Sequence, residues 1–154
     1  MSIHLALYQP DIPQNTGAAI RMSACLGLSL DIIEPCGFLW DSRKIRQSAM
    51  DYYDQASIAR HSSWNRFLEA YQGKQRIILL TTKTETNYTD FTFQKGDILL
   101  GGSESAGVPQ NVHDIVDERL TIHMHGVARS MNVINASAMI VGEALRQINK
   151  DERQ

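Results

Sequence analysis

The chain has 154 residues, of which 43% are apolar and 21% are charged, and its formal net charge is −2. This size fits one domain over residues 1–154, and the composition excludes disordered and fibrous classes of protein. The negative charge and a pI near 6.2 argue against a protein that grips long stretches of nucleic-acid phosphate, so any RNA contact should be local.

Residues 1–8 carry neither a basic leader nor a small-residue cleavage site, and we interpret them as a first strand rather than a signal peptide. The longest apolar run, residues 77–80, is much shorter than the roughly 20 residues of a membrane span. We therefore expect a cytoplasmic protein without membrane contact.

Short apolar runs alternate with helical patterns along the chain. Strands are predicted over residues 3–8, 30–34, 76–81, 97–101 and 120–124. Several are apolar nearly throughout, which is typical of parallel strands buried on both faces, and their recurrence after helical segments indicates βαβ units. The pattern predicts a three-layer α/β fold in which a parallel sheet has helices on both faces.

Four helices are expected between and after these strands. Asn15 is a suitable cap for the first, which would run to Leu26 with Gly27 as its stop and with Ala18, Met22 and Cys25 on its apolar side. Ser42 would cap the second, and Ser62 or Ser63 the third. The last carries Ile134, Ala138, Val141, Leu145 and Ile148 at helical spacing. Residues 82–95 lack any period and predict a surface loop.

The first segment with possible chemistry is residues 10–21, which follow the first strand and open the first helix. Ligands of α/β sheets bind at such strand ends. Arg21 falls beside the predicted apolar stripe rather than opposite it, although a solvated arginine is the alternative.

A second segment, residues 101–109, is a glycine-rich turn after an apolar strand. It is neither a Walker loop nor a dinucleotide fingerprint. Glu104 has either a functional role or a place near a helix start, where the helix dipole favours a carboxylate.

The third segment, residues 120–133, is a strand, a loop and the entry to the last helix. His123 and His125 lack an evident third ligand, so we expect no metal site. One of Ser130, Asn132 and Asn135 is expected to cap the helix.

A basic cluster lies at Arg43, Lys44 and Arg46, with Arg60 and Arg66 further along the chain. Such a cluster is either a solvated helix face or an RNA contact.

The three segments, in this order and spacing, resemble the SPOUT class of S-adenosylmethionine-dependent RNA methyltransferases over almost the whole chain. They are similar to that class's Pro-x-Ile-Pro-x-Asn-x-Gly-x-x-x-Arg, Gly-x-Glu-x-x-Gly-Leu-Pro and Arg-Ser-Leu/Met-Asn motifs. The run Ile33-Glu34-Pro35-x-Gly37-Phe38-x-Trp40-Asp41 and the compact length narrow the resemblance to the TrmL subfamily.

The resemblance implies a C-terminal trefoil knot that holds S-adenosylmethionine. The cofactor residues that it implies are Leu80, Gly102, Glu104, Ile122 and Ser130. Arg21 would be the catalytic residue, either as a general base or, because a guanidinium is almost always protonated, as a group that binds phosphate and stabilises an oxyanion. Arg129 and Asn132 would orient the ribose or phosphate.

The activity that the resemblance implies is 2'-O-methylation of the wobble ribose of tRNA, at position 34, with cytidine or modified uridine as the base and leucine isoacceptors as substrates. The enzyme would be a homodimer that uses its first and last helices as the interface. A methyltransferase for ribosomal RNA or another tRNA position, and a non-catalytic nucleotide- or RNA-binding module, are the alternatives. The sequence departs from the pattern at Gly101, Ala106, Val108, His123 and Val133.

Overall fold

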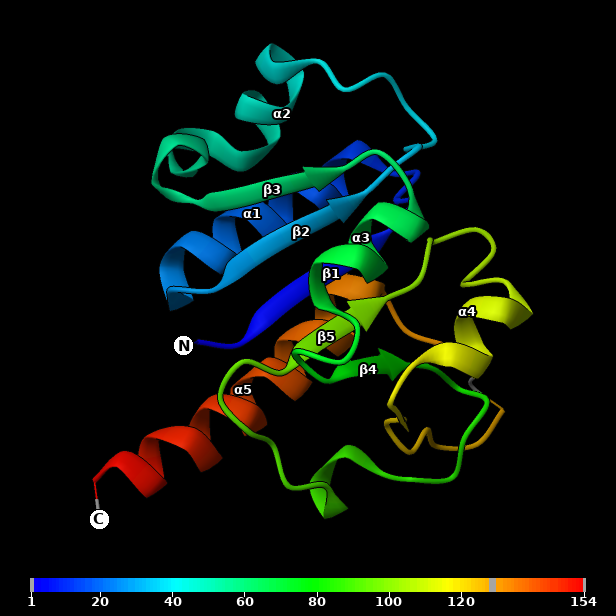
Figure 1. The fold of residues 1–154 in the computed structure, drawn as a ribbon. Helices are drawn as coiled ribbons and strands as arrows, with labels where there is room; N and C mark the ends of the chain where they lie inside the picture. The colour runs from blue at the N-terminus through cyan, green and yellow to red at the C-terminus, as the bar shows by residue number, and fades with distance from the viewer. Residues whose placement is uncertain (1, 128–129, 154) are drawn as a thin grey trace.

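The computed structural model of the protein describes residues 2–127 and 130–153, and it contains one sheet of parallel strands. The strand order is β3-β2-β1-β5-β4-β6, and every pairing is parallel. The strands are β1 (His4–Tyr8), β2 (Ser29–Ile33), β3 (Ser57–His61), β4 (Ile77–Leu80), β5 (Ile98–Gly101) and β6 (Glu118–Leu120). Because all the strands run the same way, their carboxyl ends share one edge of the sheet (Figure 1).

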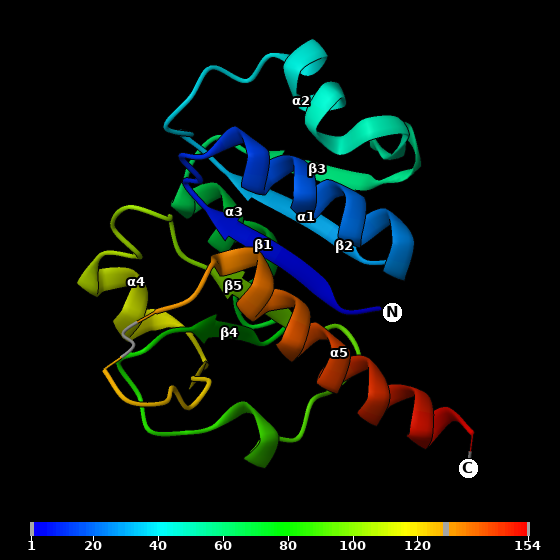
Figure 2. The ribbon, with the colours of Figure 1, turned by 180° about the vertical axis from the view of Figure 1, so that it is seen from behind.

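Helices cover both faces of this sheet (Figures 1 and 2). They are α1 (Pro13–Leu26), α2 (Ser42–Ala49), α3 (Trp64–Tyr71), α4 (Gln110–Ile115) and α5 (Val133–Glu152), with the short 3-10 helices η1 (Met50–Gln55) and η2 (Tyr88–Asp90). Buried side chains of α1, α2 and α5 share one core cluster, and those of α3 and α4 share the other. The predicted three-layer α/β architecture is confirmed.

The two cores follow from the alternation of side chains along each strand. In β1, Leu5 and Leu7 belong to the cluster under α1 and α5, whereas Ala6 and Tyr8 belong to the cluster under α3 and α4. A strand with an apolar residue at every position is therefore buried on both faces, as predicted.

The predicted apolar side of the first helix is wrong. Ala18 and Cys25 are exposed, and the buried residues of α1 are Thr16, Gly17, Ala19, Ile20 and Ser23. A Cβ atom on Gly17 would overlap Ser48 of α2, so the glycine allows the two helices to pack closely there. The side of α1 that carries Gly17 is therefore the buried side. The predicted stop is confirmed, because Gly27 has the left-handed φ of 68° that suits glycine.

Two predicted caps are also wrong. The backbone of α1 begins at Pro13, with Ile12 as its N-cap, so Asn15 already lies inside the first turn. Asp41 rather than Ser42 caps α2, by accepting a hydrogen bond from the backbone N of Arg43. Ser63 does cap α3, as predicted. In α5, Ala138 is exposed although it was expected in the apolar stripe, and Ser137 and Ala144 are buried instead.

Two edges of the sheet differ from the sequence prediction. Strand β3 was not predicted, because as an edge strand it is mostly exposed and has no apolar run. Strand β6 ends at Leu120, and of the predicted strand 120–124 only Thr121 continues, in a bridge to Asn87. The segment 82–95 is accordingly not a free surface loop: it contains η2, pairs with Thr121 and buries Phe93.

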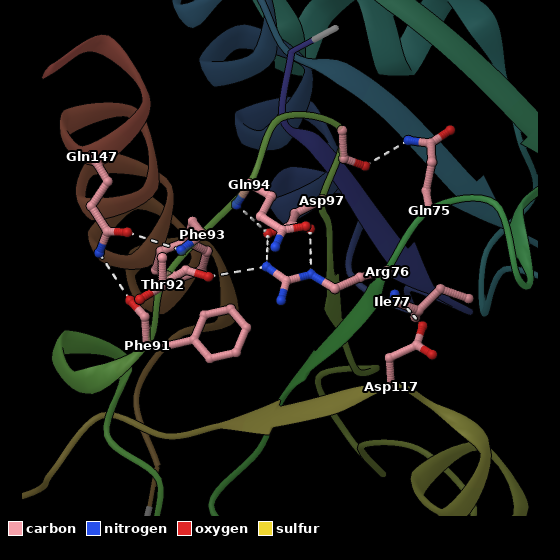
Figure 3. A network of polar contacts seen from close by, with 11 residues as sticks. Gln75, Arg76, Ile77, Phe91, Thr92, Phe93, Gln94, Asp97, Asp117 and Gln147 are labelled. Carbon is pink, nitrogen blue, oxygen red and sulfur yellow. Dashed lines mark hydrogen bonds and ion pairs between the residues drawn. The ribbon is translucent and has the colours of Figure 1, made fainter. Parts of the chain in front are cut away.

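A polar network holds β4 and β5 together at their amino ends (Figure 3). Asp97 is 1% exposed and accepts hydrogen bonds from Arg76 Nε at 2.9 Å, from Arg76 Nη2 at 2.7 Å and from the backbone N of Gln94 at 2.7 Å. The hydrogen bonds to Asp97 raise the pKa of Arg76 above its ordinary value. Gln147 of α5 donates to the carbonyl O of Phe91, so the same segment is tied to the last helix.

A second buried carboxylate lies in β2. Asp31 is 1% exposed and accepts hydrogen bonds from Tyr71 Oη at 2.8 Å, and it pairs with His61 Nε2 at 2.8 Å and His4 Nδ1 at 3.1 Å. Burial is the largest influence and raises the pKa of Asp31, but the three hydrogen bonds together hold that pKa below its ordinary value. The cluster joins three neighbouring strands to α3.

The trefoil knot and the single-domain organisation stay predictions. No helix in the described part of the chain is long and apolar enough to cross a membrane.

Candidate functional site

A pocket of about 570 Å³ lies at the carboxyl edge of the sheet. Its walls come from the end of β4, from the turn after β5 and from the segment between β6 and α5. These elements are neighbours because β4 lies between β5 and β6 in the sheet. All five predicted cofactor residues line this one pocket: Leu80, Gly102, Glu104, Ile122 and Ser130.

Gly102 is required by the close approach of two backbones in the turn after β5. A Cβ atom at this position would lie 2.8 Å from the carbonyl C of Gly107 and 2.9 Å from its Cα. The backbone N of Ser103 donates to the carbonyl O of Gly107 at 3.0 Å, and the backbone N of Gly107 donates to the carbonyl O of Ser103 at 2.9 Å. Gly107 has a left-handed φ of 66°. The turn is therefore closed on itself and leaves room on its pocket side.

A chain of side-chain amides and a carboxylate connects the three motifs. Asn132 Nδ2 donates to Asn15 Oδ1 at 3.2 Å, and Asn15 Nδ2 donates to Glu104 Oε1 at 3.2 Å. The other carboxylate oxygen, Glu104 Oε2, accepts from the backbone N of Asp11 at 2.8 Å. Segments that are about 90 and 117 residues apart in the sequence are thus fixed to one another beside the pocket.

Asn132 has a second contact that places the start of α5. Its Oδ1 accepts from the backbone N of Ile134 at 2.8 Å and from that of Asn135 at 3.1 Å. Asn132 is therefore the cap expected among the three polar residues of this segment, and its amide nitrogen remains free to bind Asn15. Capping and the link to the first motif are done by opposite ends of one side chain.

Glu104 and Asp11 form a close carboxyl pair at the pocket wall. Burial raises the pKa of Glu104 above its ordinary value, and its neighbour Asp11 raises it further. Hydrogen bonding to Glu104, and then to Ser105, lowers the pKa of Asp11. Glu104 therefore favours its protonated form more than an isolated glutamate does, and Asp11 favours its ionised form. Glu104 precedes α4 by several residues, so the alternative of a helix-start carboxylate is wrong.

Arg21 does not line the pocket. It is exposed on α1, where its Nη1 donates to Met50 Sδ at 3.1 Å and its guanidinium lies 5.4 Å from the centre of the Tyr52 ring. With Ala18 and Cys25 it occupies the outer side of the helix. Arg129 lies outside the described residues.

Asp11 was not singled out from the sequence. Its position directly before the Ile-Pro pair of the first motif was the available signal, because a loop stiffened by Pro10 and Pro13 holds its polar residues in place. One oxygen of Asp11, Oδ1, is buried and has no hydrogen-bond partner in the described part of the chain.

His123 lines a second cavity next to this pocket, with Thr82, Glu85 and Met124. Over residues 2–127 and 130–153, no three His, Cys, Asp or Glu side chains come together as a metal site.

Comparison with known proteins finds a matching family, named relatives and similar solved structures. The sequence matches the SpoU rRNA Methylase family over residues 2–142. A protein of Beijerinckia indica is 52% identical over 146 residues, which are 94% of this chain and 91% of that protein, and one of Escherichia coli K12 is 39% identical over 148 residues, or 95% and 94%. Both are named "tRNA (cytidine(34)-2'-O)-methyltransferase".

Solved structures agree with this fold. One described as "Structural insights into the 2-OH methylation of C/U34 on tRNA" superposes with a TM-score of 0.92 at 38% identity and covers 97% of both chains. The methyltransferase AviRb of Streptomyces viridochromogenes, solved with AdoMet, has a TM-score of 0.84 at 24% identity over 97% of this chain and 61% of its own, and supports the fold alone. The family resemblance predicted from the three motifs is confirmed, and the chain belongs to the SpoU methylase family.

Proposed function

We propose that this protein transfers a methyl group from S-adenosylmethionine to the ribose 2'-oxygen of the wobble nucleotide, position 34, of tRNA. The observation that carries the proposal is the convergence of all three motifs on one pocket, held together by the Asn132–Asn15–Glu104 chain. The names of the relatives from Beijerinckia indica and Escherichia coli supply the substrate.

The pocket fits this cofactor in size and shape. Its volume of about 570 Å³ lies within the range of small-molecule sites, roughly 300 to 1,000 Å³. Gly102 gives an open backbone surface, and Leu80 and Ile122 give apolar walls for a flat ring. Backbone groups of the same turns can read the edge of an adenine. When bound, S-adenosylmethionine supplies a methyl group activated by a sulfonium, which becomes a neutral thioether after transfer.

Because the 2'-hydroxyl loses its proton to solvent as the methyl group is transferred, the residues of this chain have to orient the ribose and stabilise the negative charge that develops on its 2'-oxygen. Both oxygens of Glu104 are used by Asp11 and Asn15, so we assign Glu104 to positioning the pocket wall rather than to direct contact with the cofactor. Asn132, which both caps α5 and binds Asn15, holds the wall where the ribose would enter. Arg129 remains a proposed ribose or phosphate contact on its motif position alone.

Arg21 would act from a second subunit. Exposed small and apolar residues lie on both α1 and α5, and these helices are side by side on one face (Figure 2). They include Ala18, Cys25, Met139 and Gly142. A homodimer through this face would bring the partner's Arg21 toward a pocket that its own chain's Arg21 does not line. There it would bind phosphate and stabilise the developing oxyanion.

Mixed dimers test this arrangement. Arg21→Ala and Gly102→Val subunits, each inactive alone, should regain about a quarter of the activity when mixed, because random pairing restores one complete site in half of the dimers. Recovery requires that Arg21 acts across the interface. An inactive mixture of subunits shown to exchange would contradict the assignment, and a monomer by sedimentation at micromolar concentration would contradict the dimer.

The second candidate function is 2'-O-methylation of ribosomal RNA or of another tRNA position, because the name of the matching family refers to ribosomal RNA. Near-complete coverage of both this chain and the relatives named for position 34 favours tRNA. A non-catalytic module is disfavoured because Arg21, Glu104, Ser130 and Asn132 are all present. We further propose leucine tRNAs as substrates and the cytoplasm as the location; methylation of purified leucine isoacceptors, compared with other tRNAs and ribosomal RNA, tests the choice of substrate.

A further inference from the structure

The loop of residues 34–41 borders the proposed active site and has no role in the function described so far. It follows β2, which lies next to β1, on the side to which the strand arrows point in Figure 1. The backbone N of Gly37 donates to the carbonyl O of Pro10 at 2.9 Å, and a Cβ atom on Gly37 would overlap Asp11. The loop is therefore packed on the same segment whose Asp11 binds Glu104.

This loop supports an arginine in a fixed, flat orientation. Arg60 of the edge strand β3 donates from Nε and Nη2 to the two carboxylate oxygens of Glu34, both at 3.1 Å. Its guanidinium lies 4.6 Å from the centre of the Trp40 ring, and Trp40 stacks on Phe38 with an interplanar angle of 22°. Phe38 and Trp40 in turn pack against the core. A bidentate pair on one edge and an aromatic ring beneath leave the guanidinium little freedom.

The outer side of the same arginine is open. The Arg60 side chain is 43% exposed, and Leu39, in the middle of the loop, is 88% exposed. A large apolar side chain at this level of exposure, in the same loop as the ring that carries the immobilised cation, is a surface for a partner with flat, apolar and negatively charged parts.

Charge supports a nucleic acid as that partner. Arg43 and Lys44 extend from the first turn of α2 directly after the loop, and in the described part of the chain neither forms an ion pair. Of the carboxylates in residues 34–44, Glu34 is paired with Arg60, and Asp41 accepts a backbone hydrogen bond as the cap of α2. Arg43 and Lys44, in the helix that directly follows the loop, therefore remain available for phosphates, which fits the local RNA contact expected of a chain with a net charge of −2.

We infer that Arg60, backed by Trp40 and Glu34 and flanked by Leu39, is a stacking platform for an unpaired base next to the methylated nucleotide, with Arg43 and Lys44 on the adjoining phosphates. Unpaired bases of RNA loops stack on aromatic rings and on guanidinium planes, and a platform that is already ordered loses little entropy on binding. This inference rests on the proposed function, because it takes an anticodon loop as the RNA.

The experiment uses anticodon stem-loops of leucine tRNA that carry 2-aminopurine at one loop position at a time, because stacking quenches its fluorescence. With the unaltered protein we expect quenching at a position adjacent to 34. Arg60→Lys keeps the charge and loses the plane, and should weaken stem-loop binding by about 5- to 100-fold and abolish the quench. Arg60→Gln keeps a planar group and loses the charge, and should retain more of the quench than Arg60→Lys.

One further variant tests the platform, and another is its control. Leu39→Ser changes a side chain that lies in solvent, so it should leave the melting temperature unchanged and still weaken stem-loop binding. Arg66→Lys alters an arginine that is also paired with a carboxylate, Glu69, but lies on α3, and it should bind like the unaltered protein. Affinity for S-adenosylmethionine should stay within about twofold in all four variants, since none of these residues lines the pocket.

The outcomes separate this inference from the proposed function. If the unaltered protein methylates tRNA but quenches at no loop position, or if Arg60→Lys binds and quenches normally, the platform is wrong and the function stands. Quenching that depends on Arg60 without any methyl transfer would support the platform and overturn the function.

Discussion

Replacement of Gly102 by alanine tests whether the closed turn after β5 shapes the cofactor pocket. The new Cβ would lie 2.8 Å from the carbonyl C of Gly107, closer than real Cβ atoms approach backbone. The two hydrogen bonds between Ser103 and Gly107 prevent Gly107 from moving away without loss of the turn. Overpacking of this kind costs about 1 to 3 kcal/mol.

In the free variant the turn would open to relieve the clash, so binding would have to close it again. The same cost then appears in affinity, and the Kd for S-adenosylmethionine should rise about 5- to 150-fold. Titration calorimetry with the cofactor, alongside a urea unfolding curve, measures both effects. A variant with unchanged affinity and unchanged stability would refute this account of the turn.

Gly101→Ala is the matched control, one residue earlier. Its Cβ would meet Val133 Cγ2 at 3.0 Å and Leu7 Cδ2 at 3.6 Å, which are ends of side chains rather than backbone. These can shift, so affinity should change less than about threefold.

The remaining predictions concern the two buried carboxylates. Asp97→Ala leaves the partly exposed Arg76 without its partner and should lower the free energy of unfolding, measured in urea, by about 2 to 3 kcal/mol. Glu152→Gln breaks an exposed pair with Lys95 and should lower it by less than about 1 kcal/mol. Equal losses in the two variants would contradict this ranking. Asp31→Asn should be destabilising by about 2 to 3 kcal/mol at pH 7. Because the pKa of Asp31 is lowered in the folded state, the stabilisation by Asp31 is fully present above the unfolded pKa of about 3.9 and is lost as the pH falls through the folded pKa. The difference in stability between the variant and the unaltered protein should therefore shrink in acid. Stability curves that stay parallel down to about pH 2 would contradict this.

Most of the sheet was predictable because its central strands are buried on both faces and hence apolar throughout. The edges were not. In β3, four of five residues have polar or small side chains, since one side of that strand meets solvent, and the apolar pattern on which the prediction depends is absent. The end of β6 was misplaced because Ile122 and Met124 are apolar for another reason: they line the pocket instead of a strand core.

The candidate site was predictable as a set of segments but not as a set of contacts. Parallel strands predict that the three motifs meet at one edge, and they do. The sequence favoured Asn15 as a helix cap, and only the start of α1 at Pro13 frees its side chain to join Glu104 to Asn132. The position of Arg21 could not be predicted from its spacing. Gly17 packs against α2, so the buried side of α1 is not the side that the apolar pattern indicated, and Arg21 lies on the exposed side.

The most direct test of the proposed function is a map of the methylated nucleotide. The protein is incubated with S-adenosylmethionine carrying a labelled methyl group and with total tRNA from cells that lack ribose methylation at position 34, and the labelled nucleoside is located by mass spectrometry of nuclease fragments. We predict a single 2'-O-methylated ribose at position 34. Label at another tRNA position, on a base, or only on added ribosomal RNA would contradict the proposed function.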